Sequence, residues 1–219
     1  MNRMRIFQFA VICALLCSFG ILKAQNDYDH LEPVGGIYDI YNYEFEYYSK
    51  VREILFNGLT DKPEIRFQVM ASFTPESVLD IQFDRDNNKY YIICHVCEKM
   101  IWHAYIDGNN KWKNIKVNKF KTEIDKESVE LIKSLFEIAI IQVKYRKEEI
   151  IGLDGTDYYF SVDRYGLKSG KIWSPSKMTK IGRLVDVGDK LIELAKSKKE
   201  KVKLDERLEK EIEEENNRL

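Results

Sequence analysis

Two cysteines at positions 94 and 97 form the C-x-x-C pattern that redox enzymes and zinc sites use. A redox pair needs both sulfurs near the start of a helix, and a zinc site needs further ligands. The preceding residues 90–93 are typical of a strand, and the sequence holds three histidines and no second C-x-x-C. In a strand, Cys94 and Cys97 would lie about 10 Å apart with diverging side chains. We therefore predict two buried free thiols, without a disulfide or a metal.

Ser174 and Lys177 match the S-x-x-K motif of penicillin-binding enzymes, and residues 168–170 resemble their K-T-G element. In those enzymes the serine motif comes first and K-T-G follows far downstream. Here the order is reversed and the two elements are close together. We therefore reject this assignment, and the sequence contains no other recognisable catalytic motif.

Acidic residues could still form a catalytic pair, because the pairing of two carboxylates depends on the fold. The candidates are Asp80, Asp84, Asp86, Asp154 and Asp157. Several lie in expected turns, where Asp is favoured for its hydrogen bonds to the backbone. Residues 84–88 resemble a calcium loop only in part, since the glycine and the distal glutamate of that loop are absent. The sequence therefore predicts no catalytic residue, no metal ligand and no cofactor.

Six aromatic residues lie between positions 38 and 48, and Tyr43 and Tyr47 among them are weak candidates for ligand contact. Such a cluster could stack on sugar rings. It also fits a packing face whose tyrosine hydroxyls reach water, and we favour that interpretation.

The element that must organise these residues is a helix predicted over residues 125–146. Asp125 can cap its first turn, and apolar residues recur at helical spacing around Phe136. Because its polar face is narrow, this helix has to be covered by neighbouring elements. The segments on both sides supply the cover.

Helical spacing also predicts a helix within residues 37–56 that stops at Asn57 and Gly58, although a strand near its start remains an alternative. Alternating apolar residues predict strands over 65–71, 77–83, 89–97 and 100–106, and a lysine-lined edge strand over 111–124 with a bulge. Asp154 and Gly155 predict a last hairpin between 150–153 and 157–163. A final helix, capped by Ser174 or Ser176, should bury the apolar residues of 181–195, with two glycines that weaken it or admit a close neighbour.

Residues 198–219 are rich in Lys and Glu and carry a thin apolar seam of Leu204, Leu208 and Ile212. We expect a solvated, helical or frayed tail, because three apolar residues do not sustain a coiled coil. Pairs four residues apart, such as Arg207 with Glu211, should support the helix. A helix that binds a partner is the alternative.

Residues 1–24 have the basic start and the apolar run of a secretory signal peptide, with cleavage predicted after Ala24. The run is too short for a typical membrane span, so we expect no integral span after cleavage. Cleavage removes two of the four cysteines, which leaves a chain that its core, not a disulfide framework, must stabilise. We therefore expect an exported protein, periplasmic or extracellular.

The sequence thus predicts one α+β domain over residues 25–197, a mostly antiparallel sheet packed on the central helix and a C-terminal helix. The net charge of −1 offers no electrostatic surface for nucleic acid. We expect a non-catalytic protein that binds a protein or other macromolecular partner in the cell envelope or outside it, of inhibitor or immunity type among other kinds. The alternative is a secreted hydrolase whose carboxylate pair assembles only in the fold.

Overall fold

The computed structural model describes residues 29–34, 42–108, 111–146 and 154–219, with side chains from residue 46 onward in the second range. The predicted signal peptide and its cleavage at Ala24 lie outside these residues, as does the side chain of Tyr43. Among the described residues, no helix combines the length and apolar character needed to cross a membrane.

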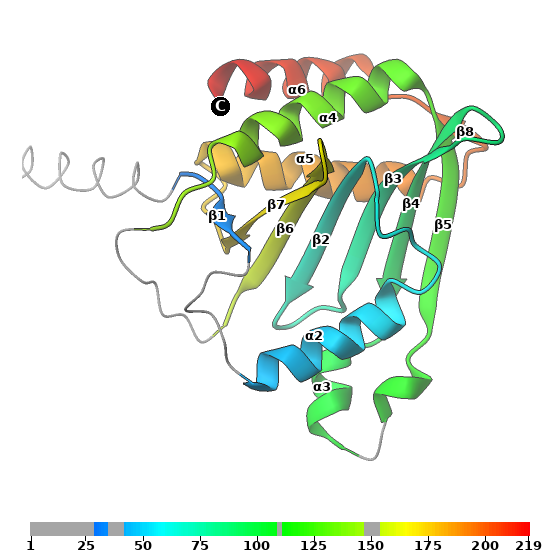
Figure 1. The fold of residues 1–219 in the computed structure, drawn as a ribbon, viewed down its shortest axis with the longest axis vertical. Helices are drawn as coiled ribbons and strands as arrows, with labels where there is room; N and C mark the ends of the chain where they lie inside the picture. The colour runs from blue at the N-terminus through cyan, green and yellow to red at the C-terminus, as the bar shows by residue number, and fades with distance from the viewer. Residues whose placement is uncertain (1–28, 35–41, 109–110, 147–153) are drawn as a thin grey trace, which may run out of the picture.

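The centre of the molecule is an eight-stranded sheet in the order β1-β7-β6-β2-β3-β4-β5-β8 (Figure 1). All neighbouring strands run antiparallel except β5 and β8. The strands are β1 (Glu32–Pro33), β2 (Ile65–Ala71), β3 (Ser77–Asp84), β4 (Lys89–Cys97), β5 (Val117–Ile124), β6 (Thr156–Asp163), β7 (Leu167–Trp173) and β8 (Lys201–Val202).

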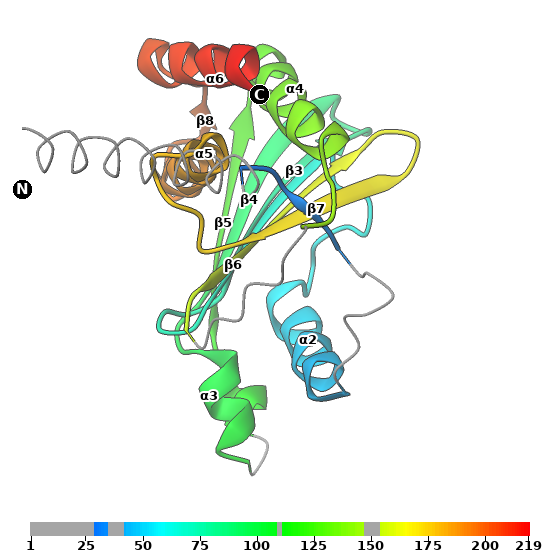
Figure 2. The ribbon, with the colours of Figure 1, turned by 90° about the vertical axis from the view of Figure 1, so that its left-hand side faces the viewer.

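Helices cover both faces of this sheet, and Figure 2 shows α5 and α2 on opposite sides of it. The helices are α2 (Asn42–Leu55), α3 (Ile101–Ile106), the 3-10 turn η1 (Lys111–Asn114), α4 (Lys126–Ile141), α5 (Lys180–Ala195) and α6 (Glu206–Arg218). The predicted α+β class, with a mostly antiparallel sheet, is confirmed.

The larger core lies between the sheet and helices α4, α5 and α6. Asp125 caps α4 as predicted, because its carboxylate accepts a hydrogen bond from Ser128 N at 2.9 Å. Phe136 is fully buried and meets Phe160 of β6 edge-to-face, with ring centroids 5.2 Å apart. Helix α4 ends at Ile141, five residues before the predicted end.

Helix α5 approaches the sheet closely because Gly188 has no side chain. A Cβ at Gly188 would lie 2.5 Å from Phe67 Cε1, and one at Gly182 would lie 2.0 Å from Ser176 O. The glycines therefore allow close packing. The helix begins later than predicted, at Lys180 with Thr179 as its N-cap. Asp29 reinforces this end by accepting from Lys180 N and Ile181 N at 3.1 and 2.9 Å.

The smaller core lies on the other face of the sheet, under α2 and α3. Val51 and Leu55 of α2 pack there against Met70, Val78 and Cys97 of the strands, with Ile101 of α3. Helix α2 ends at Leu55, just before the predicted stop at Asn57 and Gly58, and Gly58 has a φ of +90° in the turn that follows.

Three local predictions are wrong. Residues 101–106 form helix α3 instead of a strand, because the buried Glu76 carboxylate accepts from the amides of Ile101 and Trp102. The last hairpin joins β6 to β7, a strand that the sequence did not predict; residues 150–153, the other predicted arm, lie outside the described residues, and β2 and β7 occupy both edges of β6. Strand β5 pairs with β4 without a bulge from Val117 to Ile124. The change of apolar phase arises because Ile115 and Val117 face the smaller core, whereas Phe120 and Ile124 face the larger one.

The prediction that residues 198–219 form a solvated tail is also wrong, although residues 206–218 are helical as expected. Leu204, Leu208 and Ile212 belong to the larger core, and α6 lies alongside α4. Glu211 binds Lys190 of α5 instead of Arg207, so the predicted pair within the helix does not form. Three apolar residues are too few for a coiled coil, but they are enough to dock α6 here because they pack against two helices of the same chain, α4 and α5.

Candidate functional site

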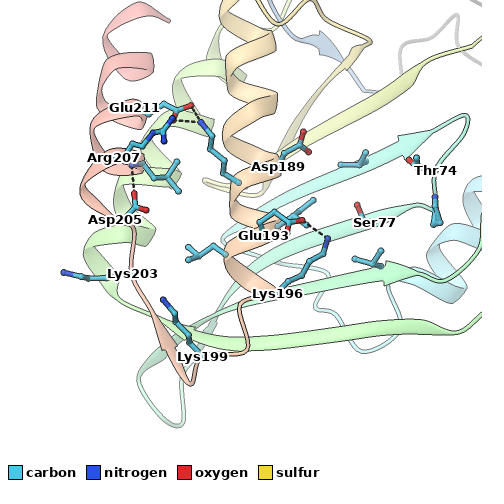
Figure 3. Close-up of a pocket in the computed structure, with 17 residues that line it drawn as sticks. Thr74, Ser77, Asp189, Glu193, Lys196, Lys199, Lys203, Asp205, Arg207 and Glu211 are labelled. Atoms are coloured by element: carbon cyan, nitrogen blue, oxygen red, sulfur yellow. Dashed lines mark hydrogen bonds and ion pairs between the residues drawn. The ribbon is translucent and has the colours of Figure 1, made fainter.

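An open cavity of about 770 Å³ lies around the C-terminal half of α5, and we call it the α5 cavity (Figure 3). Three regions distant in sequence line it: the ends of β2, β3 and β4 with the turn between β2 and β3, the end of α5 from residue 189 with Lys196 after it, and residues 199–211. Its volume falls within the range of about 300–1,000 Å³ that is usual for ligand sites. The second cavity described below falls in the same range, and we take the α5 cavity as the candidate binding site because charged side chains of α5 and of residues 199–211 converge on it.

The connector between α5 and α6, residues 196–205, is held at several points. Glu200 O accepts from Glu123 N at 3.2 Å, and Val202 pairs with Ile124 at the edge of the sheet. Leu204 is buried, and its amide donates to Ser128 Oγ at 3.1 Å. The wall of the cavity that the connector forms is therefore fixed by the fold.

The acidic residues of the cavity are mostly engaged. Glu193 pairs with Lys196 at 3.0 Å, and Glu211 pairs with Lys190. Asp205 caps α6 by accepting from Leu208 N at 2.8 Å. These three carboxylates are matched by groups of the fold.

The remaining acid, Asp189, is the exception. Partial burial raises the pKa of its carboxyl above the ordinary value and the negative charge of Asp186 raises it further, although the residue as a whole is exposed at the surface. Figure 3 shows Asp189 on the side of α5 toward Ser77, away from the connector. A carboxyl group with a raised pKa in a cavity is of the kind that acts as a general acid in enzymes.

The cations of the connector side are not matched in this way. Lys199, Lys203 and Arg207 are exposed, and none makes an ion pair within the described residues. Lys201, between the first two, pairs with Glu123 at 3.0 Å. The connector side thus has three cations without an ion pair among the described residues, and the lining as a whole, with five cations and four acids, carries a formal charge of +1.

A second cavity of about 870 Å³ lies beside α3 and is lined by Phe73, Met100 and His103 among others. Phe73 is 73% exposed at its rim. Pro75 lines both cavities, so the turn between β2 and β3 separates them. Among the described residues, the acids that line this cavity are Glu98 and Asp107, and both are exposed.

Tyr47, one of the two ligand candidates, is occupied within the fold. Its hydroxyl donates to Glu76 Oε1 at 2.8 Å, and its ring meets Trp102 edge-to-face at 5.1 Å. Burial, followed by the negative charge of Glu76, raises the pKa of Tyr47. Tyr47 thus packs within the fold, and its hydroxyl binds the buried Glu76 instead of reaching water as the packing interpretation expected.

Glu76 is the residue that sequence reasoning missed. It is fully buried and binds Tyr47 together with the first amides of α3. Its only sequence signal was its place in a Thr-Pro-Glu turn. Arg66 and Asp80, also buried, form a bidentate pair on the same face with two bonds of 2.7 Å. Neither group borders either cavity.

Cys94 and Cys97 lie in β4 as predicted, and they are buried free thiols in opposite cores. Burial raises the pKa of each thiol to about 12. His95 between them lies against Leu55 O, with Nδ1 at 2.7 Å. Within the described ranges, no three His, Cys, Asp or Glu side chains are placed to hold a metal ion.

The rejected motifs have structural roles. Ser174 Oγ accepts from Thr156 N at 2.8 Å, and Ser176 Oγ accepts from Met178 N at 3.4 Å. Asp84 accepts from the amides of Asp86 and Asn87 in the turn between β3 and β4. The Asp84 contacts are those expected of a turn residue.

No protein-family model, curated protein or solved structure matches the chain. Function has to be argued from the geometry above.

Proposed function

We propose that this chain is an exported, non-catalytic protein that binds a macromolecular partner in the cell envelope or outside it. Inhibitors and immunity-type proteins that neutralise an exported enzyme act in this way. The α5 cavity is the surface that we assign to the partner.

The observation that supports this proposal is that the buried carboxylates bind other groups of the fold. Glu76 binds α3 and Tyr47, Asp80 binds Arg66, and Glu215 of α6 binds Arg183 of α5 at 2.7 Å. Each of these acids holds two elements of the fold together. In an enzyme that uses a carboxylate pair, the corresponding groups would converge on a cavity.

The alternative, a hydrolase, is favoured by one observation, the raised pKa of Asp189 in the α5 cavity. A carboxylate mechanism needs a second carboxylate as base or nucleophile. Glu193 lines the same cavity, but Lys196 engages it. We therefore rank the hydrolase second.

The test begins with the protein purified from the cells that produce it, after mild cross-linking, with mass spectrometry of what accompanies it. We expect one macromolecule to be enriched and to bind again when both components are pure. The Asp189→Asn variant should bind it equally well, since the carboxylate has no chemical role in this proposal.

Turnover would overturn the proposal. If the purified protein hydrolyses a glycoside, ester or peptide from a substrate panel, and Asp189→Asn abolishes that activity, the hydrolase replaces the binder. For the predicted export, N-terminal sequencing of the mature protein should begin at Gln25; a retained Met1 would contradict it.

A further inference from the structure

We infer that the connector side of the α5 cavity binds an acidic segment of a polypeptide, so that partner carboxylates meet Lys199, Lys203 and Arg207. This inference rests on the proposed binding function and specifies the chemistry of the partner.

The first argument is charge complementarity. The neighbouring acids Glu193, Asp205 and Glu211 already have partners, whereas the three cations have none in the described part of the chain. Figure 3 shows Lys199 and Lys203 on the connector and Arg207 at the start of α6, beyond α5 from Thr74 and Ser77. Bound carboxylates would balance this local positive charge.

The second argument is preorganisation. Lys203 lies between Val202, which pairs with β5, and Leu204, whose amide binds Ser128. Arg207 lies in the first turn of α6, which Asp205 caps. Because the backbone beneath these cations is fixed, the entropy lost on binding a partner would come mainly from ordering their side chains.

The third argument concerns the class of partner. The apolar side chains of Leu194 in α5 and Leu208 in α6 also line the cavity, so it offers more than charge. A polypeptide segment that mixes carboxylates with apolar side chains matches both features. A nucleic acid or an anionic membrane would need a wide basic surface, and the net charge of the chain is −1.

The probe is a fluorescein-labelled octapeptide that alternates Glu with Leu, and its counterpart has Gln in place of every Glu. Fluorescence anisotropy measures binding to the full chain. The variant Lys199→Glu/Lys203→Glu reverses the charge of two of the three exposed cations without touching a buried residue. Its matched control is Lys62→Glu/Lys168→Glu, two exposed lysines far from the cavity in sequence and absent from its lining, with the same change in charge.

We expect the Glu peptide to bind the wild-type chain and the control with affinities within about twofold, and the cavity variant about tenfold more weakly. The Gln peptide should bind about tenfold more weakly than the Glu peptide. Raising the salt from 0.1 to 1 M should weaken the Glu peptide, because the Debye length falls from about 10 to about 3 Å.

Four outcomes would overturn the inference: no binding of the Glu peptide up to about 1 mM, equal binding of the Gln peptide, equal losses in both charge variants, or equally tight binding of a short DNA of the same charge. The proposed function fails separately. If a partner is captured and Lys199→Glu/Lys203→Glu retains it fully, the binder stands and the acidic segment does not.

Discussion

On the face of the sheet that α4, α5 and α6 cover, the buried side chains are mostly apolar and form one large cluster, with Glu215 of α6 as a buried charged group that pairs with Arg183. On the face that α2 and α3 cover, the apolar cluster has six buried members, and the buried polar groups Glu76, Arg66, Asp80 and His95 complete the contacts. The first face depends mainly on apolar area removed from water. The second depends on hydrogen-bond partners, whose loss leaves a buried charge or amide unmatched. The two faces should therefore fail in different ways.

The largest effect should come from removing residues 203–219, which uncovers the apolar face. Leu204, Leu208 and Ile212 are buried, and burying such a side chain contributes about 1.5–3 kcal/mol. We expect the free energy of unfolding, measured with urea and circular dichroism, to fall by about 5 kcal/mol.

Should the truncated chain fail to fold, Ile212→Ala tests the same packing at a cost of about 2–5 kcal/mol. The exposed Glu213→Ala is its control, with an expected change within about 0.5 kcal/mol. A truncation that costs less than about 1 kcal/mol would show that α6 does not contribute to the core.

The apolar face was also the more predictable one from sequence. Helix α4 followed from a stripe at helical spacing and from Asp125 at its cap, because both signals are local. The buried face of α5, Ile181 through Ala195, followed in the same way. Local signals could not predict that α6 packs on α4 and α5, because the contacts of its apolar residues depend on how these helices are arranged in the fold.

The polar face and the cavity resisted sequence reasoning for a related reason. The Glu76 carboxylate accepts from the Ile101 amide only because β3 and β4 pair. A Thr-Pro-Glu turn gives no sequence signal for a buried carboxylate that binds the start of a helix. The α5 cavity joins residues near 75, 96, 190 and 207, so its cations became a group only in three dimensions. The strand assignment of 89–97, in contrast, was enough to predict that Cys94 and Cys97 diverge.

On the polar face, Asp80→Asn should cost about 3 kcal/mol, because it leaves the buried Arg66 guanidinium without its counter-charge. The substitution changes the volume hardly at all, so the loss cannot come from a cavity. Urea unfolding at pH 7 measures it.

The double variant Arg66→Met/Asp80→Leu sharpens this result. Removing both charges should recover part of the loss, since no buried charge then remains. If Asp80→Asn costs less than about 1 kcal/mol, the pair is not a support of this face.

The two cysteines allow a direct comparison of the faces with one chemical change. Cys94→Ser places a hydroxyl in the apolar core and should cost about 1–3 kcal/mol. Cys97→Ser should cost less, because Cys97 lies beside Glu76, to whose backbone oxygen its amide donates at 3.0 Å, and the surroundings of the smaller core are more polar. Equal losses at both positions would contradict the difference between the faces.

The smallest effect concerns pH and His95. Burial lowers the pKa of His95 in the folded state, although the hydrogen bond to Leu55 opposes this. The unfolded chain therefore binds a proton more readily than the folded chain as the pH falls below about 6.5. Stability contributed by the neutral imidazole is fully present above that value, and it declines on acidification until the folded-state pKa is passed.

A series of urea unfolding curves between pH 7.5 and 5 measures this decline. The His95→Gln variant keeps an amide that can donate to Leu55 O but does not titrate. In this variant the part of the decline that belongs to His95 should disappear, while the response of the acidic groups remains. His103→Gln is the matched control, since His103 is exposed beside the second cavity. If both variants keep the slope of the wild-type chain, His95 does not carry the acid sensitivity of the polar face.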